Sequence, residues 1–174
     1  MITLNDIKDA KKRLDGTVYK TPLMKAPFLS IQKNAEIFFK EDNLQLTGSF
    51  KLRGAFNKVA MLDDVKKAAG VVAASAGNHA QGLAFAASYF KCEATIFMPE
   101  ATPLTKVLGV KSYGANVVLT GENFDEAYAS AIKFAKDNNK EFVHPFADDE
   151  VIAGQGTIAL EILEKIEDID EIIV

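Results

Sequence analysis

Apolar residues recur along this chain with two different periods. The helical period, in which apolar side chains lie three or four positions apart, predicts helices over residues 4–14, 49–62, 78–90, 103–112, 123–138 and 152–166. Short apolar runs predict strands over residues 36–40, 71–75, 94–98, 116–119, 141–143 and 171–174. Because strands and helices alternate, the pattern predicts an α/β fold in which a parallel sheet is flanked by helices in three α/β/α layers.

One lysine stands at an unusual place in this pattern. Thr47 and Ser49 are residue types that cap helices, so the helix is expected to begin near Ser49 and to carry Lys51 in its first turn. The positive end of a helix dipole disfavours a further cation there, which makes the free amine more available. Lysines that form Schiff bases need a free amine. The simpler alternative is a solvated surface lysine.

A second feature follows the predicted strand 71–75. There, Ala76-Gly77-Asn78-His79 leads into a long apolar helix, and the free amides at such a helix start favour an anion. A P-loop is excluded because Leu83 and Ala84 stand where lysine and a hydroxyl residue are required. The dinucleotide fingerprint fails as well, since four other residues follow Gly77 before the next glycine. A carboxylate remains a suitable ligand, although glycine in this turn also serves packing alone.

Composition narrows the function classes. The chain has 174 residues, 20 basic and 24 acidic, which gives a net charge of −4 without a basic patch, so we expect no nucleic-acid partner. No apolar run reaches the length of a membrane span, and Cys92, the lone cysteine, fits a reducing cytoplasm. His79 and His144 lie apart without a cysteine or carboxylate cluster, so we expect no metal site.

Several motifs carry a resemblance to a known family. They are Lys40-Glu41-Asp42-Asn43, Thr47-Gly48-Ser49-Phe50-Lys51-Leu52-Arg53-Gly54-Ala55, Ser75-Ala76-Gly77-Asn78-His79-Ala80-Gln81-Gly82, Met98-Pro99, Thr102-Pro103, Lys106-Val107, His144-Pro145-Phe146 and Val151-Ile152-Ala153-Gly154-Gln155-Gly156-Thr157. In this order they resemble the pyridoxal-phosphate enzymes of the tryptophan-synthase-β type (fold type II), and specifically the threonine and serine dehydratases. The resemblance runs from about residue 19 to residue 174.

The resemblance implies pyridoxal 5'-phosphate as the cofactor, with Lys51 as the Schiff-base and catalytic lysine. Phe50 and Asn78 would also contact the cofactor, Asn78 at the phenolic oxygen of its ring. The substrate carboxylate would bind the turn formed by Ser75, Ala76, Gly77, Asn78 and His79. Residues 52–147 would form a small α/β domain, and residues 1–51 and 148–174 would belong to an incomplete large cofactor-binding domain.

The resemblance also implies a choice of activity, namely elimination of water and ammonia from L-threonine, with L-serine as a second substrate. Serine racemases place a second serine directly before the glycine of the carboxylate turn, as a proton donor. Ala76 occupies that position here and cannot transfer a proton. We therefore expect elimination rather than racemisation.

One expected part of the family pattern is missing. The family binds the cofactor phosphate in a glycine-rich loop after the next strand, and no such cluster occurs here. We therefore expect an N-terminal portion of a longer, truncated enzyme, inactive alone and a homodimer or homotetramer when complete. The alternative is a non-catalytic α/β domain that binds a carboxylate or another small molecule. Lys51 favours the enzyme, and the absent loop favours the binding domain.

Overall fold

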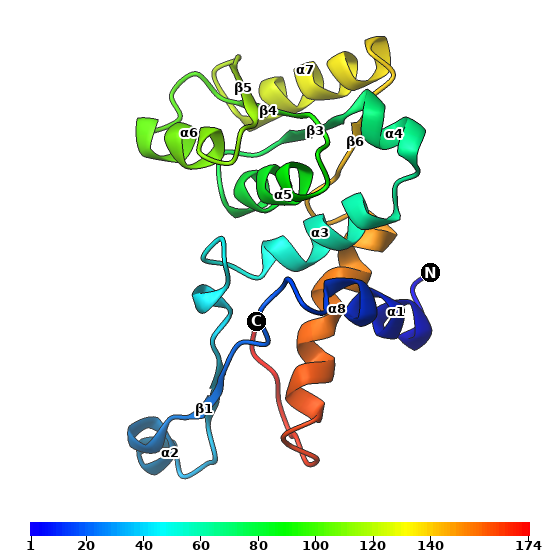
Figure 1. Ribbon diagram of the computed structural model, residues 1–174. Coiled ribbons are helices and arrows are strands. Elements are labelled where there is room, and N and C mark those ends of the chain that lie inside the picture. The colour runs from blue at the N-terminus through cyan, green and yellow to red at the C-terminus, as the bar shows by residue number, and fades with distance from the viewer.

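The computed structural model describes all 174 residues, and its centre is a four-stranded parallel sheet (Figure 1). Its strands are β3 (Val71–Ala74), β4 (Ala94–Met98), β5 (Asn116–Leu119) and β6 (Glu141–Phe142), in the order β5-β4-β3-β6. Val72 lies opposite Thr95 on β4 and Phe142 on β6. All four carboxyl ends therefore meet at one edge of the sheet.

Helices cover both faces of this sheet. Helix α7 (Phe124–Asp137) lies on one face, and α5 (Asn78–Tyr89) and α6 (Leu104–Lys111) lie on the other (Figure 1). Successive strand residues point to opposite faces. Val72 and Ala74 accordingly pack with α7, whereas Val71 and Ala73 belong to the larger core with α5. The predicted three-layer α/β/α arrangement is confirmed.

A helical layer continues beyond α5. Helix α3 (Lys51–Met61) packs against both α5 and α8 (Asp149–Leu163), and α1 (Leu4–Leu14) packs against α8. Two glycines permit the crossing of α3 and α8: a Cβ on Gly154 would lie 2.5 Å from the Arg53 carbonyl oxygen, and one on Gly54 would lie 2.6 Å from the Val151 carbonyl oxygen. The two backbones are thus in direct contact.

The strand predicted over residues 36–40 is confirmed as β2, but the pattern did not predict several other short elements. An antiparallel pair joins β1 (Leu23–Lys25) to β2 (Phe38–Lys40), with α2 (Pro27–Lys33) between them, and this segment projects from the body (Figure 1). A 3-10 turn, η1 (Asp42–Leu44), and helix α4 (Asp64–Ala69) complete the chain. The unpredicted elements β1, α2, η1 and α4 are each too short to display a full hydrophobic period.

Three predictions at helix and strand ends are wrong. The helix predicted over residues 152–166 begins and ends three residues earlier, at Asp149–Leu163, because the Asp148 side chain caps its start. Residues 171–174 form no strand, because no neighbouring strand lies beside them to accept their backbone hydrogen bonds. Helix α3 begins at Lys51 after Phe50 and has no side-chain cap, so neither Thr47 nor Ser49 caps it. In contrast, Leu4–Leu14, Ala94–Met98 and Asn116–Leu119 agree with their predicted bounds.

A buried ionic network joins the segment before α3 to α8. Arg53 is 1% exposed and its guanidinium donates to both carboxylate oxygens of Asp42, at 2.6 and 2.9 Å. It also donates to Glu161 on α8 at 2.6 Å, and Glu161 accepts from Lys40 Nζ at 2.6 Å. The charges are therefore paired, as burial requires.

None of the helices is both long and apolar enough to cross a membrane.

Candidate active site

The predicted site residues lie where β3 ends at the carboxyl edge of the sheet. The Ser75–Gly77 turn leaves β3, and Asn78 begins α5. This edge is where open parallel sheets bind their ligands. A Cβ on Gly82 of α5 would lie 3.1 Å from the Leu52 backbone, so the start of α3 lies directly against α5. The packing of α3 on α5 thereby brings Lys51 to the same edge.

Lys51 is the first residue of α3, as predicted to within its first turn. Its Nζ donates to the carbonyl oxygen of Pro145, 3.0 Å away, in the loop that follows β6. Partial burial lowers the pKa of the Lys51 amine below its ordinary value. The ring of Phe50, which is 36% exposed, has its centre 5.2 Å from Lys51 Nζ. The amine is thus desolvated, held in place and beside an accessible aromatic face.

The turn after β3 presents free hydrogen-bond donors. The hydroxyl oxygen of Ser75 accepts a bond from the Gly77 amide at 3.2 Å. The first amide bonded to a carbonyl of this turn is that of Gln81, which reaches Gly77 at 3.4 Å. The amides of Asn78 and His79 therefore precede the first intrahelical bond, as at every helix start, and are donors for an anion.

The five residues of the predicted carboxylate turn have different surroundings. Ser75, Ala76 and Gly77 are half-buried, whereas Asn78 is exposed at the first position of α5. The Asn78 amide can therefore reach a ligand without moving any core residue. His79, the fifth member, is buried.

The His79 side chain points into the protein. It is 3% exposed, and its Nε2 donates to the carbonyl oxygen of Val143 over 3.0 Å. Burial lowers the pKa of His79 to about 4, and the neighbouring Lys51 and His144 act in the same direction. Its Nδ1 is buried without a hydrogen-bond partner. The imidazole is thus neutral and bridges α5 to the loop after β6.

Sequence reasoning missed the groups that hold Lys51 and His79. Both side chains donate to backbone carbonyls, those of Pro145 and Val143. The His144-Pro145-Phe146 run was visible as a motif, but a carbonyl acceptor has no side-chain signature. The hydroxyls of Thr47 and Ser49, taken for caps, are instead buried without partners just before α3.

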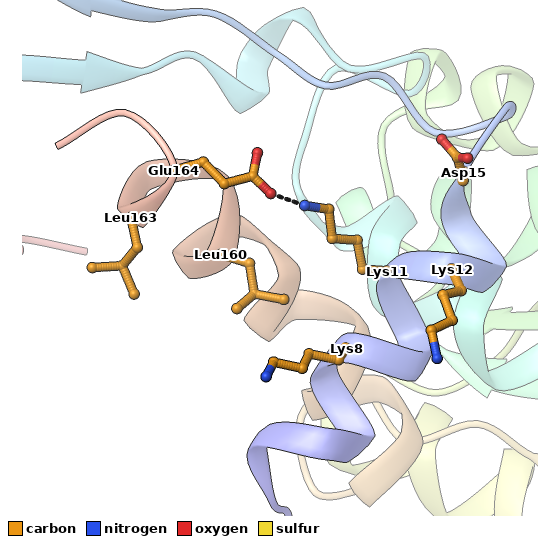
Figure 2. Close-up of a pocket in the computed structure, with 7 residues that line it drawn as sticks. All are labelled: Lys8, Lys11, Lys12, Asp15, Leu160, Leu163 and Glu164. Carbon is orange, nitrogen blue, oxygen red and sulfur yellow. Dashed lines mark hydrogen bonds and ion pairs between the residues drawn. The ribbon is translucent and has the colours of Figure 1, made fainter. Parts of the chain in front are cut away.

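A hollow of about 590 Å³ lies elsewhere, between α1 and α8 (Figure 2). Lys8, Lys11 and Lys12 line it from α1, Leu160 and Leu163 line it from α8, and Asp15 and Glu164 line it from just after these helices. Lys11 is paired with Glu164, and Lys12 with Asp9 outside the hollow. Because it contains no predicted site residue, and two of its lysines are already paired, we place the candidate site at the strand ends.

Comparison with known proteins shows the family of the chain. The family described as pyridoxal-phosphate dependent enzyme matches residues 14–174. The chain belongs to this family. An L-threonine ammonia-lyase of Thermotoga maritima is 51% identical over 174 residues, which are all of this chain and 43% of that protein. The fold is that of fold type II enzymes.

Solved structures of the family agree. A serine racemase from Dictyostelium discoideum has a TM-score of 0.91 and 36% identity, and the match covers 97% of this chain and 55% of that one. The processed form of threonine deaminase isoform 2 from Solanum lycopersicum has a TM-score of 0.89 and 39% identity over 95% and 45% of the two chains. The chain spans about half the length of the relatives it matches.

Family membership implies pyridoxal phosphate as the cofactor. The residues present fit the part of it that bears the aldehyde: Lys51 offers an amine whose pKa is lowered by burial. The buried, unpartnered hydroxyls of Thr47 and Ser49 lie in the turn that leads to this amine. Phe50 offers an aromatic face beside this amine, and Asn78 offers an exposed amide at the first position of α5.

Proposed function

We propose that the complete product of this gene is a threonine ammonia-lyase, which converts L-threonine to 2-oxobutanoate and ammonia and accepts L-serine more weakly. The observation that carries the proposal is the Lys51 amine, desolvated at the first position of α3 and anchored on Pro145 at the sheet edge where the Ser75 turn offers its amides. The relatives of this chain named as threonine ammonia-lyases and dehydratases support it.

Each residue has a role in this proposal. The cofactor, when bound, supplies an electron sink for the negative charge that develops at the substrate Cα. Lys51 binds the cofactor and, once free, accepts the Cα proton. The amides that begin α5 and the Ser75 turn bind the substrate carboxylate, and Asn78 and Phe50 orient the cofactor ring.

The atoms balance as an elimination. Lys51 takes the proton from Cα, this proton leaves overall with the β-hydroxyl group as one molecule of water, and the resulting enamine is released. Water then hydrolyses the enamine to the 2-oxo acid and ammonia. No external oxidant or reductant is required.

Racemisation is the second candidate, because a serine racemase is among the similar structures. Racemisation needs a proton donor on the face opposite the lysine. Ala76, half-buried in the turn before Gly77, carries no such group. A carboxylate-binding domain without catalysis is the third candidate, but a desolvated amine at Lys51 has no purpose there.

The proposal extends to the assembly and location of the enzyme. Residues 52–147 act as a small domain that closes over the substrate, and residues 1–51 and 148–174 belong to the larger domain. The complete enzyme is a homodimer or homotetramer. Its location is cytoplasmic, which agrees with the free, buried thiol of Cys92.

The test is a product assay on this chain and on the complete gene product, each with added pyridoxal phosphate. L-Threonine should give 2-oxobutanoate with the complete product, and replacement of Lys51 by alanine should abolish it. D-Serine formed from L-serine without a 2-oxo acid would favour the racemase. Binding of substrate without any product would favour the non-catalytic domain, and either result would overturn the proposal.

A further inference from the structure

We infer that His79 is a positioning residue for Lys51: through Val143 it fixes the loop of residues 143–147, on which the Lys51 amine is seated. This inference rests on the proposed function, which assigns the amine its role. It goes beyond that function by giving the His79 side chain a task other than contact with substrate.

The loop after β6 receives side chains from two helices. His79 of α5 donates to the Val143 carbonyl oxygen at 3.0 Å, and Lys51 of α3 donates to the Pro145 carbonyl oxygen at 3.0 Å. The two acceptors are two residues apart in the chain. A displacement of Val143 would therefore move the acceptor of Lys51 as well.

The loop itself is folded tightly around His144. The Nδ1 atom of His144 accepts from the amides of Phe146 at 3.2 Å and Ala147 at 2.8 Å. The amide of Val143 donates to the Val72 carbonyl oxygen of β3 at 2.8 Å. Since Val143 is bonded at both its amide and its carbonyl, it is the point at which the loop is fixed to the sheet.

His79 is suited to hold this point permanently. Its Nε2 carries the proton, because it donates to a carbonyl, and burial keeps the ring neutral at physiological pH. The His79 side chain is 3% exposed, and His79 lies in the first turn of α5. The free backbone amides of this turn are the proposed donors for an anion. His79 thus links the turn proposed to bind the anion to the loop whose Pro145 carbonyl accepts from Lys51.

The inference predicts that loss of the His79 donor lets water reach Lys51. The loop then loses its bond to α5, and the midpoint of Lys51 titration rises toward the ordinary value of 10.5. The amides of Phe146 and Ala147 should exchange about tenfold faster with solvent.

The experiment compares three variants of the chain without cofactor. His79→Leu removes the donor, and His79→Gln restores an amide N–H near the place of Nε2. Asn57→Leu is the matched control. Asn57, on α3, is buried as His79 is, and its side chain also donates to a backbone carbonyl, that of Glu150, at 2.7 Å. The titration midpoint of Lys51 is measured by competitive labelling with an amine reagent and mass mapping, and the loop by hydrogen exchange.

The expected result is a raised Lys51 midpoint and faster loop exchange in His79→Leu, with both restored in His79→Gln and unchanged in Asn57→Leu. An unchanged midpoint in a folded His79→Leu, or the same rise in Asn57→Leu, would overturn the inference. If His79→Leu does not fold, His79→Asn takes its place, since its shorter amide cannot reach Val143. Neither readout uses the cofactor, so failure of the proposed function would leave this test intact.

Discussion

Two side chains with lowered pKa values lie together at the candidate site, and burial is the main cause of both. More of Lys51 is present as the free amine because its ammonium form loses solvation. His79 becomes a permanent neutral donor for the same reason. Burial therefore favours the free amine of Lys51 and keeps the imidazole of His79 neutral.

The His79 pKa predicts a loss of stability in acid. The ordinary pKa of 6.5 applies to the unfolded chain, whereas the folded value is about 4. Between these values the unfolded chain binds a proton that the folded chain excludes, so stability is complete above pH 6.5 and falls as the pH drops toward 4. The total loss is about 3 kcal/mol. Urea unfolding from pH 7.5 to 4 should show this loss.

The control is His79→Gln, which keeps a donor but does not titrate in this range. Its unfolding free energy should vary less than that of the wild type by about the same 3 kcal/mol. Equal pH dependence in the two chains would show that His79 does not account for the acid sensitivity.

At the scale of elements, the crossing of α3 and α8 determines where Lys51 lies. Gly54 and Gly154 allow the two backbones to touch, and this contact begins at Arg53, two residues after Lys51. A side chain at either position would separate the helices and move the first turn of α3 relative to the sheet edge. The glycines thus act on the site without contacting it.

Gly154→Ala should destabilise the fold by about 2 kcal/mol, because its Cβ would meet the Arg53 carbonyl oxygen at 2.5 Å. Gly109→Ala is the matched control on α6, where the nearest atoms, in the Gln81 side chain, lie at 3.7 Å. Alanine is also the better helix former, so this variant should gain up to about 1 kcal/mol. Thermal unfolding of both variants measures the difference. Equal effects would mean that the helix crossing is not tightly packed.

The sequence predicted the long elements better than their ends. Helix α1 and strands β4 and β5 carry full hydrophobic periods and were predicted at their observed bounds. The Ser49 cap was wrong, because capping depends on whether a hydroxyl faces a free amide, and the Ser49 hydroxyl is buried elsewhere. The strand at 171–174 was wrong because a strand needs a neighbour as well as an apolar run.

For the candidate site too, the sequence predicted local features but not the contacts between distant residues. Lys51 was placed in the first turn of a helix from residue type and the predicted helix start, which are local properties, whereas Asn78 was assigned from the family resemblance. The hydrogen bond from Lys51 to the Pro145 carbonyl joins residues 94 positions apart, and that from His79 to the Val143 carbonyl joins residues 64 positions apart. Only the assembled fold shows such contacts.

At the scale of the whole molecule, the Arg53 network connects parts that the sheet does not reach. It ties β2 and η1 to α3 and α8 through Lys40, Asp42, Arg53 and Glu161. A buried pair of this kind gives little net stability but is costly to break, because the remaining charge stays buried. It therefore specifies how the helical layer meets the N-terminal segment.

Glu161→Ala should lower the unfolding free energy by about 3 kcal/mol or more, since it leaves both Arg53 and Lys40 without this carboxylate. Asp137→Ala breaks the exposed pair with Lys133 on α7 and should cost about 0.5 kcal/mol or less. Urea unfolding of both variants checks the prediction. A cost for Glu161→Ala as small as that for Asp137→Ala would contradict it.

The central claim is that Lys51 is the amine that binds the cofactor, and the most direct measurement is a borohydride trap. The 174-residue chain and the complete gene product are incubated with pyridoxal phosphate, reduced, digested and mapped by mass. We expect the pyridoxyl group on Lys51 in preference to the other lysines, with Lys106 of α6 serving as an internal reference. Labelling of the complete product that spares Lys51, or that is spread evenly over the lysines, would contradict the account.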